Sequence, residues 1–183
     1  MNIFILSSSP FISAIMQCDS HVTKMTLESA QMLCTAHRVL DGELIIGKSP
    51  TGRKQKQYVL TENNDVIYKA AHVNHPCSIW VRQSDKNYDW LYEHFKSLAE
   101  EFTYRYGKEH LCWTKLGQLL ATPPRNIPVT NDLTPFAQAM PDEYRDSNAI
   151  VAYNNYYRSK MEKMKMVWTK RNTPEWVEYK HAA

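Results

Sequence analysis

The sequence predicts a mainly α protein: a single compact helical domain over residues 1–183 with a small β-hairpin-like excursion. Three observations support this fold class. Apolar residues recur at helical spacing over about 21–39 and again over about 77–106. Strand-like patterns and turn residues are confined to an insertion at 43–75. Hydrophobic residues make up 43% of the 183 residues, which is enough for one packed core.

The first half of the chain carries clear start and stop signals. Residues 2–6 read as either a short strand or an extended segment, and Pro10 is expected to begin a short helix. Asp19 or Ser20 is the expected N-cap of the first long helix, which Asp41-Gly42 should end. Within the insertion we expect short strands around turns, at 43–47, 56–62 and 66–69.

The second half is helical with one long irregular connection. Pro76 is expected to begin a helix that continues past a joint near Ser84-Asp85, and Gly107 should end it. The remaining expected segments are a shorter helix at about 109–121, a proline-rich wrapping loop at 122–146, a last helix at about 147–165 and an aromatic, basic tail at 166–183.

Composition excludes several classes of protein. No stretch approaches the roughly 18–20 apolar residues that cross a bilayer, so we expect no membrane association. The first residues, MNIFILSSSPFISAIMQ, lack the basic start of a signal peptide, so a cytoplasmic location with reduced thiols is expected. The chain has no glycine-rich phosphate loop, no HExxH and no GxSxG. The four cysteines are Cys18, Cys34, Cys77 and Cys112.

Positive charge is concentrated in two segments although the net charge is only +3. Residues 48–56 hold four bases and no acid, and residues 158–171 hold six bases and one acid. Together they carry +9, so the rest of the chain carries −6. Such patches are typical of surfaces that bind a phosphate backbone, and they also occur as ordinary solvated segments.

Four polar residues form a stripe along the first long helix: His21, Lys24, Glu28 and Gln31. At 3.6 residues per turn they share an arc of about 80° that borders the apolar face. An exposed Glu–Lys pair at this spacing contributes only about 0.3–0.5 kcal/mol. At the edge of a cleft, the same groups would shift each other's pKa. The stripe is therefore either a candidate catalytic site or an amphipathic border.

The same helix carries a resemblance to a known family. Asp19-x-His21, with Glu28 seven residues after the histidine, follows a short N-terminal segment. A basic and aromatic C-terminus, AYNNYYRSKMEKMKMVWTKRNTPEWVEY, ends the chain. In spacing and in the order of elements, the chain resembles the pyrimidine-dimer DNA glycosylases of the T-even phage type, also called endonuclease V of that phage. It also resembles uncharacterised phage proteins that begin with a similar CD-x-H-x-x-K-M-x-x-E-x-A-Q helix.

The resemblance implies an all-α DNA-repair hydrolase that binds duplex DNA and removes a damaged or modified pyrimidine. In this family the matching glutamate is catalytic, which assigns the central role to Glu28. The location would then be the cytoplasm of the host cell, and no cofactor is expected. Candidate catalytic residues are Glu28, His21, Lys24 and Gln31. Candidate DNA-binding residues are Arg53, Lys54, Arg158, Lys163, Lys165, Trp168, Lys170, Arg171 and Trp176, with Tyr179 as a further stacking candidate.

The glycosylase chemistry leaves the nucleophile open. Breaking the glycosidic bond develops positive charge on the sugar, which a carboxylate at position 28 would stabilise. An amine that forms a Schiff base could be the terminus at Met1 or the side chain of Lys24. His21 would orient a phosphate or relay a proton.

Three alternatives remain from the sequence. Asn2 and Gln31 differ from the family pattern, which favours a non-catalytic accessory protein that binds DNA or a host protein. A nucleoside- or nucleotide-processing enzyme could use the same glutamate. A zinc site could be built from Cys18, His21, His75 and Cys77, with His72 and His110 as other contributors, although the spacing of the second pair is unusual.

Overall fold

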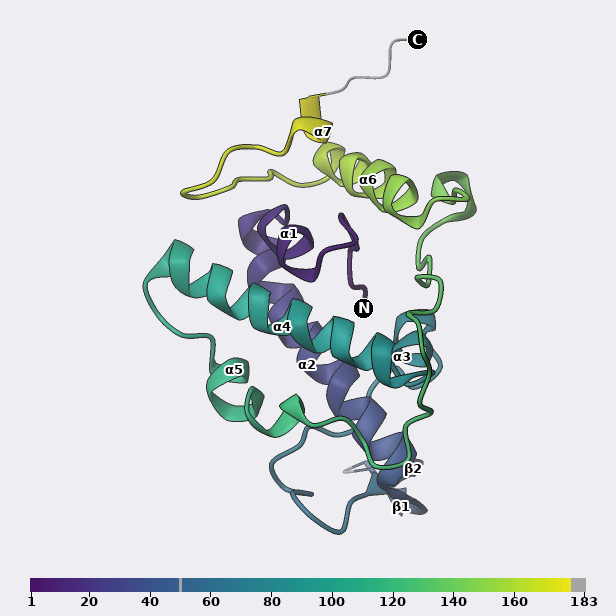
Figure 1. Cartoon of the computed structure of the whole chain (residues 1–183). Helices are drawn as coiled ribbons and strands as arrows, with labels where there is room; N and C mark the ends of the chain where they lie inside the picture. The colour runs from purple at the N-terminus through teal and green to yellow at the C-terminus, as the bar shows by residue number, and fades with distance from the viewer. Residues whose placement is uncertain (50, 179–183) are drawn as a thin grey trace.

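The protein is mainly α with a small β-hairpin (Figure 1). The computed structural model describes residues 1–49 and 51–178, so Tyr179 lies outside the described residues. In chain order the elements are α1 (Pro10–Ile15), α2 (Asp19–Asp41), β1 (Glu43–Lys48), β2 (Lys54–Val59), α3 (Pro76–Val81), α4 (Asp85–Tyr106), α5 (Leu111–Leu116), the 3-10 turns η1 (Leu119–Ala121) and η2 (Asp142–Tyr144), α6 (Ala149–Ser159), η3 (Lys160–Glu162) and α7 (Glu175–Glu178).

Helices α2 and α4 cross at the centre of the molecule and carry most of the core (Figure 1). Met25, Met32 and Leu33 of α2 are fully buried, as are Leu91 and Phe95 of α4. Helix α1 packs on α4, and the N-terminal segment lies between these helices and α6 at one end of the molecule (Figure 1). The hairpin lies at the opposite end of α2. Among the described residues, no helix is long and apolar enough to cross a bilayer.

The expected N-cap of α2 is wrong. The N-cap is Cys18, which makes no side-chain capping bond, and Asp19 is already the first residue of the helix. The Asp19 carboxylate instead accepts hydrogen bonds from Arg105 on α4, at 2.8 Å, and from the Thr169 hydroxyl at 2.6 Å. Long-range partners therefore use the side chain that local capping preferences assign to the helix end. Gly42 ends the helix as expected.

The helix at Pro76 and its joint are confirmed. Pro76 occupies the first turn of α3, and Ser84 caps α4 by accepting from the backbone N–H of Asn87. Gly107 ends α4 with a left-handed backbone, φ 70°, that a side chain would strain.

The insertion contains two of the three expected strands. Strands β1 and β2 pair antiparallel from Glu43 opposite Val59 to Lys48 opposite Lys54. The expected strand at 66–69 is wrong: those residues lie in turn and irregular structure. The carbonyl oxygens of Ile67 and Tyr68 accept hydrogen bonds from the Arg38 guanidinium, so they are not available to a neighbouring strand.

The two later helices are shorter than expected. The helix expected at 109–121 consists of α5 and the separate turn η1, and the one expected at 147–165 ends at Ser159 and continues as η3. After η3 the chain extends along the start of α2, where the carbonyl of Val167 accepts from the backbone N–H of Asp19 at 2.8 Å. After η3, a backbone hydrogen bond to α2 therefore takes the place of the helical hydrogen bonds that were expected up to residue 165.

The sequence left open whether residues 2–6 form a short strand or an extended segment. In the structure the N-terminal segment, residues 1–6, forms no strand. Ile3, Phe4, Ile5 and Leu6 are buried. Their backbone groups bond to side chains: Gln17 donates to the carbonyl of Ile3 at 3.1 Å, and Ser13 to that of Phe4 at 3.2 Å. Because side chains satisfy these polar groups, a segment without sheet partners can be buried.

Candidate functional site

The N-terminal segment places its first residues against Glu28 in the middle of α2. The backbone N–H of Asn2 donates to Glu28 Oε2 at 2.8 Å. Asn2 is held in turn by its own side chain, which donates to the carbonyl of Ala139 at 2.7 Å and accepts from the backbone N–H of Ile3 at 2.8 Å. Glu28 is 9% exposed, so its charge is largely shielded from water. A buried carboxylate that keeps a fixed orientation is the centre of the candidate site.

Two amines flank this carboxylate. The amino group of Met1 lies 3.8 Å from Glu28 Oε2, and Nζ of Lys24 lies 3.5 Å from Oε1. The Met1 side chain is buried, whereas 64% of the Lys24 side chain is exposed. One carboxylate therefore contacts an inner amine and an outer amine, and the outer one is accessible to a ligand.

His21 lies two turns before Glu28 on α2, in an aromatic environment. Its ring stacks on Phe4 with centroids 4.8 Å apart, and its Nδ1 lies 2.7 Å from the hydroxyl of Tyr157. Burial, together with the nearby charges of Lys160 and Lys24, lowers the pKa of His21 to about 4. The imidazole is therefore neutral near pH 7, when it can orient or accept but is not a cation.

Sequence reasoning missed three contributors to this site. Asn2 contributes a backbone N–H. Lys160 places its ammonium over the ring of Tyr156, 4.3 Å from the centroid, and contributes positive charge next to His21. The pKa of His75 is lowered by burial, by the Met1 amine and by His72, while the charge of Glu28 acts in the opposite direction. These three residues come from three separate parts of the chain, and no local spacing connects them.

Gln31, the last member of the stripe, is half-buried one turn beyond Glu28. Three cavities are described in the structure, and Glu28 lines none of them. One shallow cavity of about 610 Å³ is lined by residues that adjoin the site in sequence. Its lining residues Pro76 and Gln138 are the sequence neighbours of His75 and Ala139. The carboxylate thus lies next to the N-terminal segment and outside all three of these cavities.

Several residues expected to bind DNA are engaged within the protein. The Arg171 guanidinium donates to both oxygens of Glu101, at 3.0 and 2.8 Å. Arg158 donates to the carbonyl of Trp176 at 2.6 Å, and Lys170 to that of Tyr104 at 2.8 Å. These three cations position the chain after α6. Their charge still contributes to the surface field, and Lys170 remains exposed while it makes this bond.

The two tryptophans pack against the domain. Trp168 is 8% exposed, and its indole N–H donates to the carbonyl of Met16 at 2.9 Å. Trp176 is half-buried with its ring edge-on to Tyr157, at 5.5 Å between centroids. Trp168 is therefore too buried to stack on a base in this arrangement. Lys163 and Lys165, by contrast, are exposed between η3 and Trp168.

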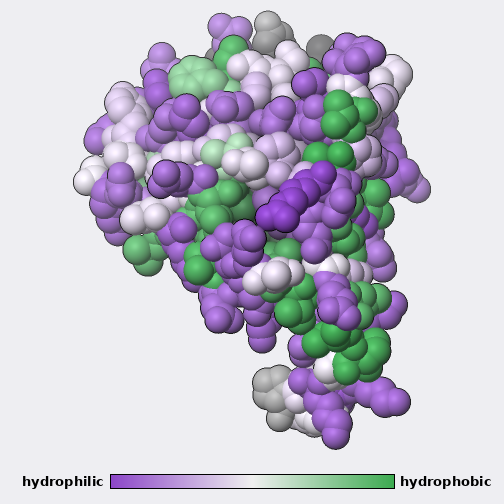
Figure 2. Space-filling model, turned by 60° about the horizontal axis from the view of Figure 1, so that its bottom comes forward, coloured by the Kyte–Doolittle hydropathy of each residue, from purple (hydrophilic) through white to green (hydrophobic). Residues whose placement is uncertain are grey.

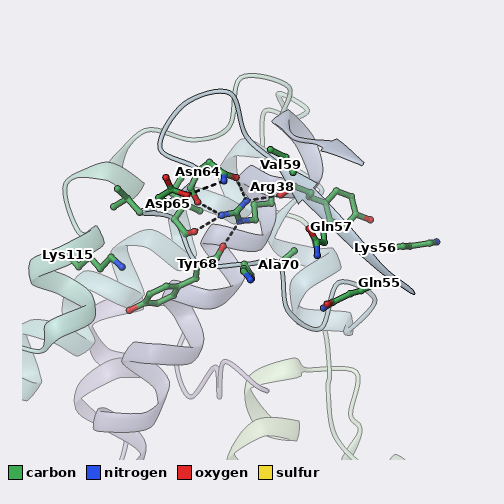
Figure 3. Close-up of a pocket in the computed structure, with 14 residues that line it drawn as sticks. Arg38, Gln55, Lys56, Gln57, Val59, Asn64, Asp65, Tyr68, Ala70 and Lys115 are labelled. Carbon is green, nitrogen blue, oxygen red and sulfur yellow. Dashed lines mark hydrogen bonds between the residues drawn. The ribbon is translucent and has the colours of Figure 1, made fainter. Parts of the chain in front are cut away.

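The other basic segment lies on the hairpin, far along α2 from Glu28. Arg53 and Lys54 are exposed at its end. Beside the hairpin a cavity of about 370 Å³ is lined by residues of β2, the loop 64–70, Arg38 and Lys115 (Figure 3). In Figure 3 the Arg38 side chain lies at the back of this cavity among the carbonyls that it contacts, while Lys56 points away from it. The basic segment of the hairpin and Glu28 therefore lie on different parts of the surface, whereas Lys160 of the other basic segment lies near His21.

The residues considered for zinc do not come together. Within residues 1–49 and 51–178, no three His, Cys, Asp or Glu side chains form a group that could hold a metal ion. His75 accepts from the backbone N–H of Cys77 as the N-cap of α3, and His21 bonds to Tyr157. Burial raises the pKa of the Cys77 thiol to about 11, so it is protonated near pH 7.

The fold and the site define a mainly α protein with a buried carboxylate between two amines. Comparison of the chain with family models, with curated proteins and with solved structures finds no match.

Proposed function

We propose that the protein is a DNA-processing enzyme that releases a damaged or modified pyrimidine, in the manner of a DNA glycosylase. One observation carries the proposal: the buried Glu28 carboxylate accepts from the Asn2 backbone and lies within 4 Å of the amines of Met1 and Lys24. A carboxylate with an adjacent amine is the pair that breaking a glycosidic bond through a covalent intermediate requires.

The proposed reaction assigns a role to each group. As the bond between the base and C1′ breaks, the base leaves with the bonding electrons and takes up a proton. The positive charge that develops on the sugar is stabilised by Glu28. The unprotonated amine attacks C1′ and gives up one proton to water or to a neighbouring base. The C1′–O4′ bond then breaks, O4′ takes up the second proton as a hydroxyl, and the imine of the opened sugar forms, which water later hydrolyses. His21, neutral near pH 7, orients a phosphate or accepts a proton.

The position of the carboxylate favours DNA over a free nucleoside as the substrate. A small molecule is usually bound in a cavity that covers most of its surface. Glu28 lines none of the three described cavities, and Lys24, Lys163 and Lys165 present exposed cations. A bent duplex can itself cover a site that is open in the free protein.

Base release tests the proposal. Ultraviolet-irradiated and modified duplexes are incubated with the wild type, with Glu28→Gln, and with the control Glu62→Gln, whose side chain is 72% exposed. We expect the wild type and the control to release a base at equal rates, and Glu28→Gln to be slower by at least about 100-fold, as for loss of one electrostatic group. Equal rates for wild type and Glu28→Gln would overturn the proposal.

Borohydride trapping identifies the amine. Reduction of the imine links protein to DNA, and mass spectrometry of the cross-linked peptide distinguishes the terminal residue from Lys24. Lys24→Met should leave trapping intact if the inner amine reacts, and abolish it if the outer one does. Base release without any trapped complex would assign the attack to water and leave Glu28 as the stabilising group.

A second candidate function is DNA binding without catalysis. The observation that favours it is that Glu28 is already bonded to groups of the protein itself and lines none of the described cavities. This function predicts salt-dependent binding of duplex DNA by both wild type and Glu28→Gln, with every base retained.

A further inference from the structure

The hairpin has two chemically different faces. In the register of β1 and β2, Leu44 lies opposite Tyr58, Ile46 opposite Lys56, and Lys48 opposite Lys54. Because opposed residues share a face, these six side chains form one face, which we call the outward face. The alternate face carries Glu43, Ile45, Gly47, Gln55, Gln57 and Val59. The cavity next to the loop 64–70 is lined by Gln55, Gln57 and Val59 of this face and, at its edge, by Lys56 and Tyr58 of the outward face. In Figure 3 the end of the Lys56 side chain points away from the other lining residues.

The outward face is exposed, basic and apolar at once. Ile46 is 64% and Leu44 is 48% exposed, and all three lysines are exposed. Figure 2 shows hydrophobic and hydrophilic residues side by side on this end of the molecule. Arg53 adds a fourth exposed cation beyond the strands, and the outward face contains no acidic residue. A two-stranded hairpin exposed to this extent gains little stability by itself, so a binding role accounts for it better than a packing role does.

Arg38 fixes the hairpin to the helix that carries the candidate site. Its buried guanidinium donates to the carbonyl of Tyr58 on β2 at 2.7 Å. It also donates to the carbonyls of Asn64, Ile67 and Tyr68, at 2.7, 2.6 and 2.6 Å. These acceptors are neutral carbonyl groups, so the arginine connects backbone segments to α2. The hairpin therefore has a defined position relative to Glu28.

We propose that the outward face of the hairpin binds in the major groove of duplex DNA, as a second contact beside the Glu28 site. This inference rests on the proposed DNA substrate. A major groove about 12 Å wide admits a two-stranded ribbon. The lysines meet phosphates along its edges, while Leu44 and Ile46 contact apolar base edges such as thymine methyl groups. A single strand would instead need several stacking rings, and the outward face carries one aromatic residue, Tyr58.

The spacing along α2 suits one duplex. Glu28 precedes the end of the helix at Asp41 by thirteen residues, or about 20 Å at 1.5 Å per residue. That is about six base pairs at 3.4 Å each. The hairpin therefore contacts DNA roughly half a turn or more away from the base at Glu28, and it adds affinity without taking part in the chemistry.

Binding of undamaged duplex tests the inference, in a Glu28→Gln background so that no reaction intervenes. Fluorescence anisotropy compares the parent with Lys48→Gln/Lys54→Gln/Lys56→Gln. The matched control removes the same charge elsewhere, with Lys86→Gln/Lys96→Gln/Lys108→Gln on and after α4. We expect the hairpin variant to bind at least about 10-fold more weakly, with a plot of log K against log salt less steep by about 2.7 for three lost phosphate contacts. In the control variant, both the affinity and the salt slope should change by less than in the hairpin variant.

A second variant separates groove binding from charge alone. Leu44→Thr/Ile46→Thr keeps the charge and the strand propensity, so it should weaken binding while leaving the salt slope unchanged. Equal losses in the lysine variant and its control, no loss in either hairpin variant, or a parent that does not bind duplex would each overturn the inference. Failure of base release with these binding effects intact would overturn the proposed reaction and leave the hairpin contact standing.

Discussion

The backbone N–H of Asn2 and the carboxylate of Glu28 are joined by a 2.8 Å hydrogen bond across 26 residues of sequence. This bond holds the start of the chain against the middle of α2, and it brings the Met1 amine to 3.8 Å from the same carboxylate. Glu28 thus has a structural role besides the proposed catalytic one. The free energy of unfolding reports the first role and the rate of base release reports the second, so a substitution can affect them differently.

The first prediction concerns the stability that this contact provides. Glu28→Gln keeps the shape but removes the charge that strengthens the bond from Asn2, so the free energy of unfolding should fall by about 1–2 kcal/mol. Lys24→Met removes the exposed partner of the pair and should cost no more than about 0.5 kcal/mol. Urea unfolding measures both. Equal costs would mean that the interaction with Lys24, not the bond from Asn2, dominates.

The second prediction concerns pH. The pKa of His21 is lowered from 6.5 to about 4, so the unfolded chain takes up a proton at a higher pH than the folded one does. The stability is therefore complete above about pH 6.5 and is lost as the pH falls toward 4, by about 3 kcal/mol from this group. His94, whose pKa is also lowered to about 4 by burial, acts in the same direction.

His21→Gln isolates the contribution of one histidine. Unfolding free energies are measured at about pH 7 and about pH 5 for the variant and the wild type. We expect the variant to lose less stability on acidification, because one of the groups that take up a proton on unfolding is gone. An identical loss in both proteins would show that His21 is protonated in the folded state.

The third prediction concerns the attachment of the segment after η3. Glu101 accepts from Arg105 at 2.7 Å and from two nitrogens of Arg171 at 2.8 and 3.0 Å, and its side chain is 2% exposed. Glu101→Gln leaves the buried guanidinium of Arg105 with Asp19 as its remaining carboxylate partner. We expect a loss of about 3–5 kcal/mol in the free energy of unfolding.

Limited proteolysis provides the local measurement for this network. Arg171→Gln removes the half-buried partner and leaves the Glu101–Arg105 pair, so the global stability should change by less than in Glu101→Gln. Trypsin cleavage near Lys163 and Lys165 should nevertheless become faster in both variants. Unchanged cleavage in Arg171→Gln would show that Trp168 and Thr169 hold the segment without the arginine.

The fourth prediction concerns Arg38. Arg38→Met keeps an apolar stem but removes the hydrogen bonds to the carbonyls of Tyr58, Ile67 and Tyr68. We expect faster hydrogen exchange at the amides of β1 and β2, with little change at α4, because the hairpin loses its connection to α2. Arg82→Met, at the C-cap of α3, is the control: Arg82 also donates to backbone carbonyls, and its loss should leave the hairpin unchanged.

Signals that act over a few residues allowed much of the fold to be predicted. Pro76, Gly107 and the helical spacing of 77–106 specify α3 and α4, because start, stop and periodicity are local properties. The stripe on α2 was correctly placed at the border of the core, with His21 and Glu28 buried and Lys24 exposed. The charge pattern also identified the hairpin end, where Arg53 and Lys54 are exposed.

Long-range contacts decided the rest. Asp19 is not a cap because Arg105 and Thr169 take its carboxylate, and residues 66–69 are not a strand because Arg38 takes their carbonyls. Trp168 is buried rather than available for stacking because the last segment extends along α2. By itself the sequence determined where the main helices α2, α3 and α4 lie and that Glu28 borders the core. Only the tertiary structure brought Asn2 and His75 close to that carboxylate and Lys160 close to His21, since hydrogen bonds and charges act between groups that are close in space wherever they lie in the chain.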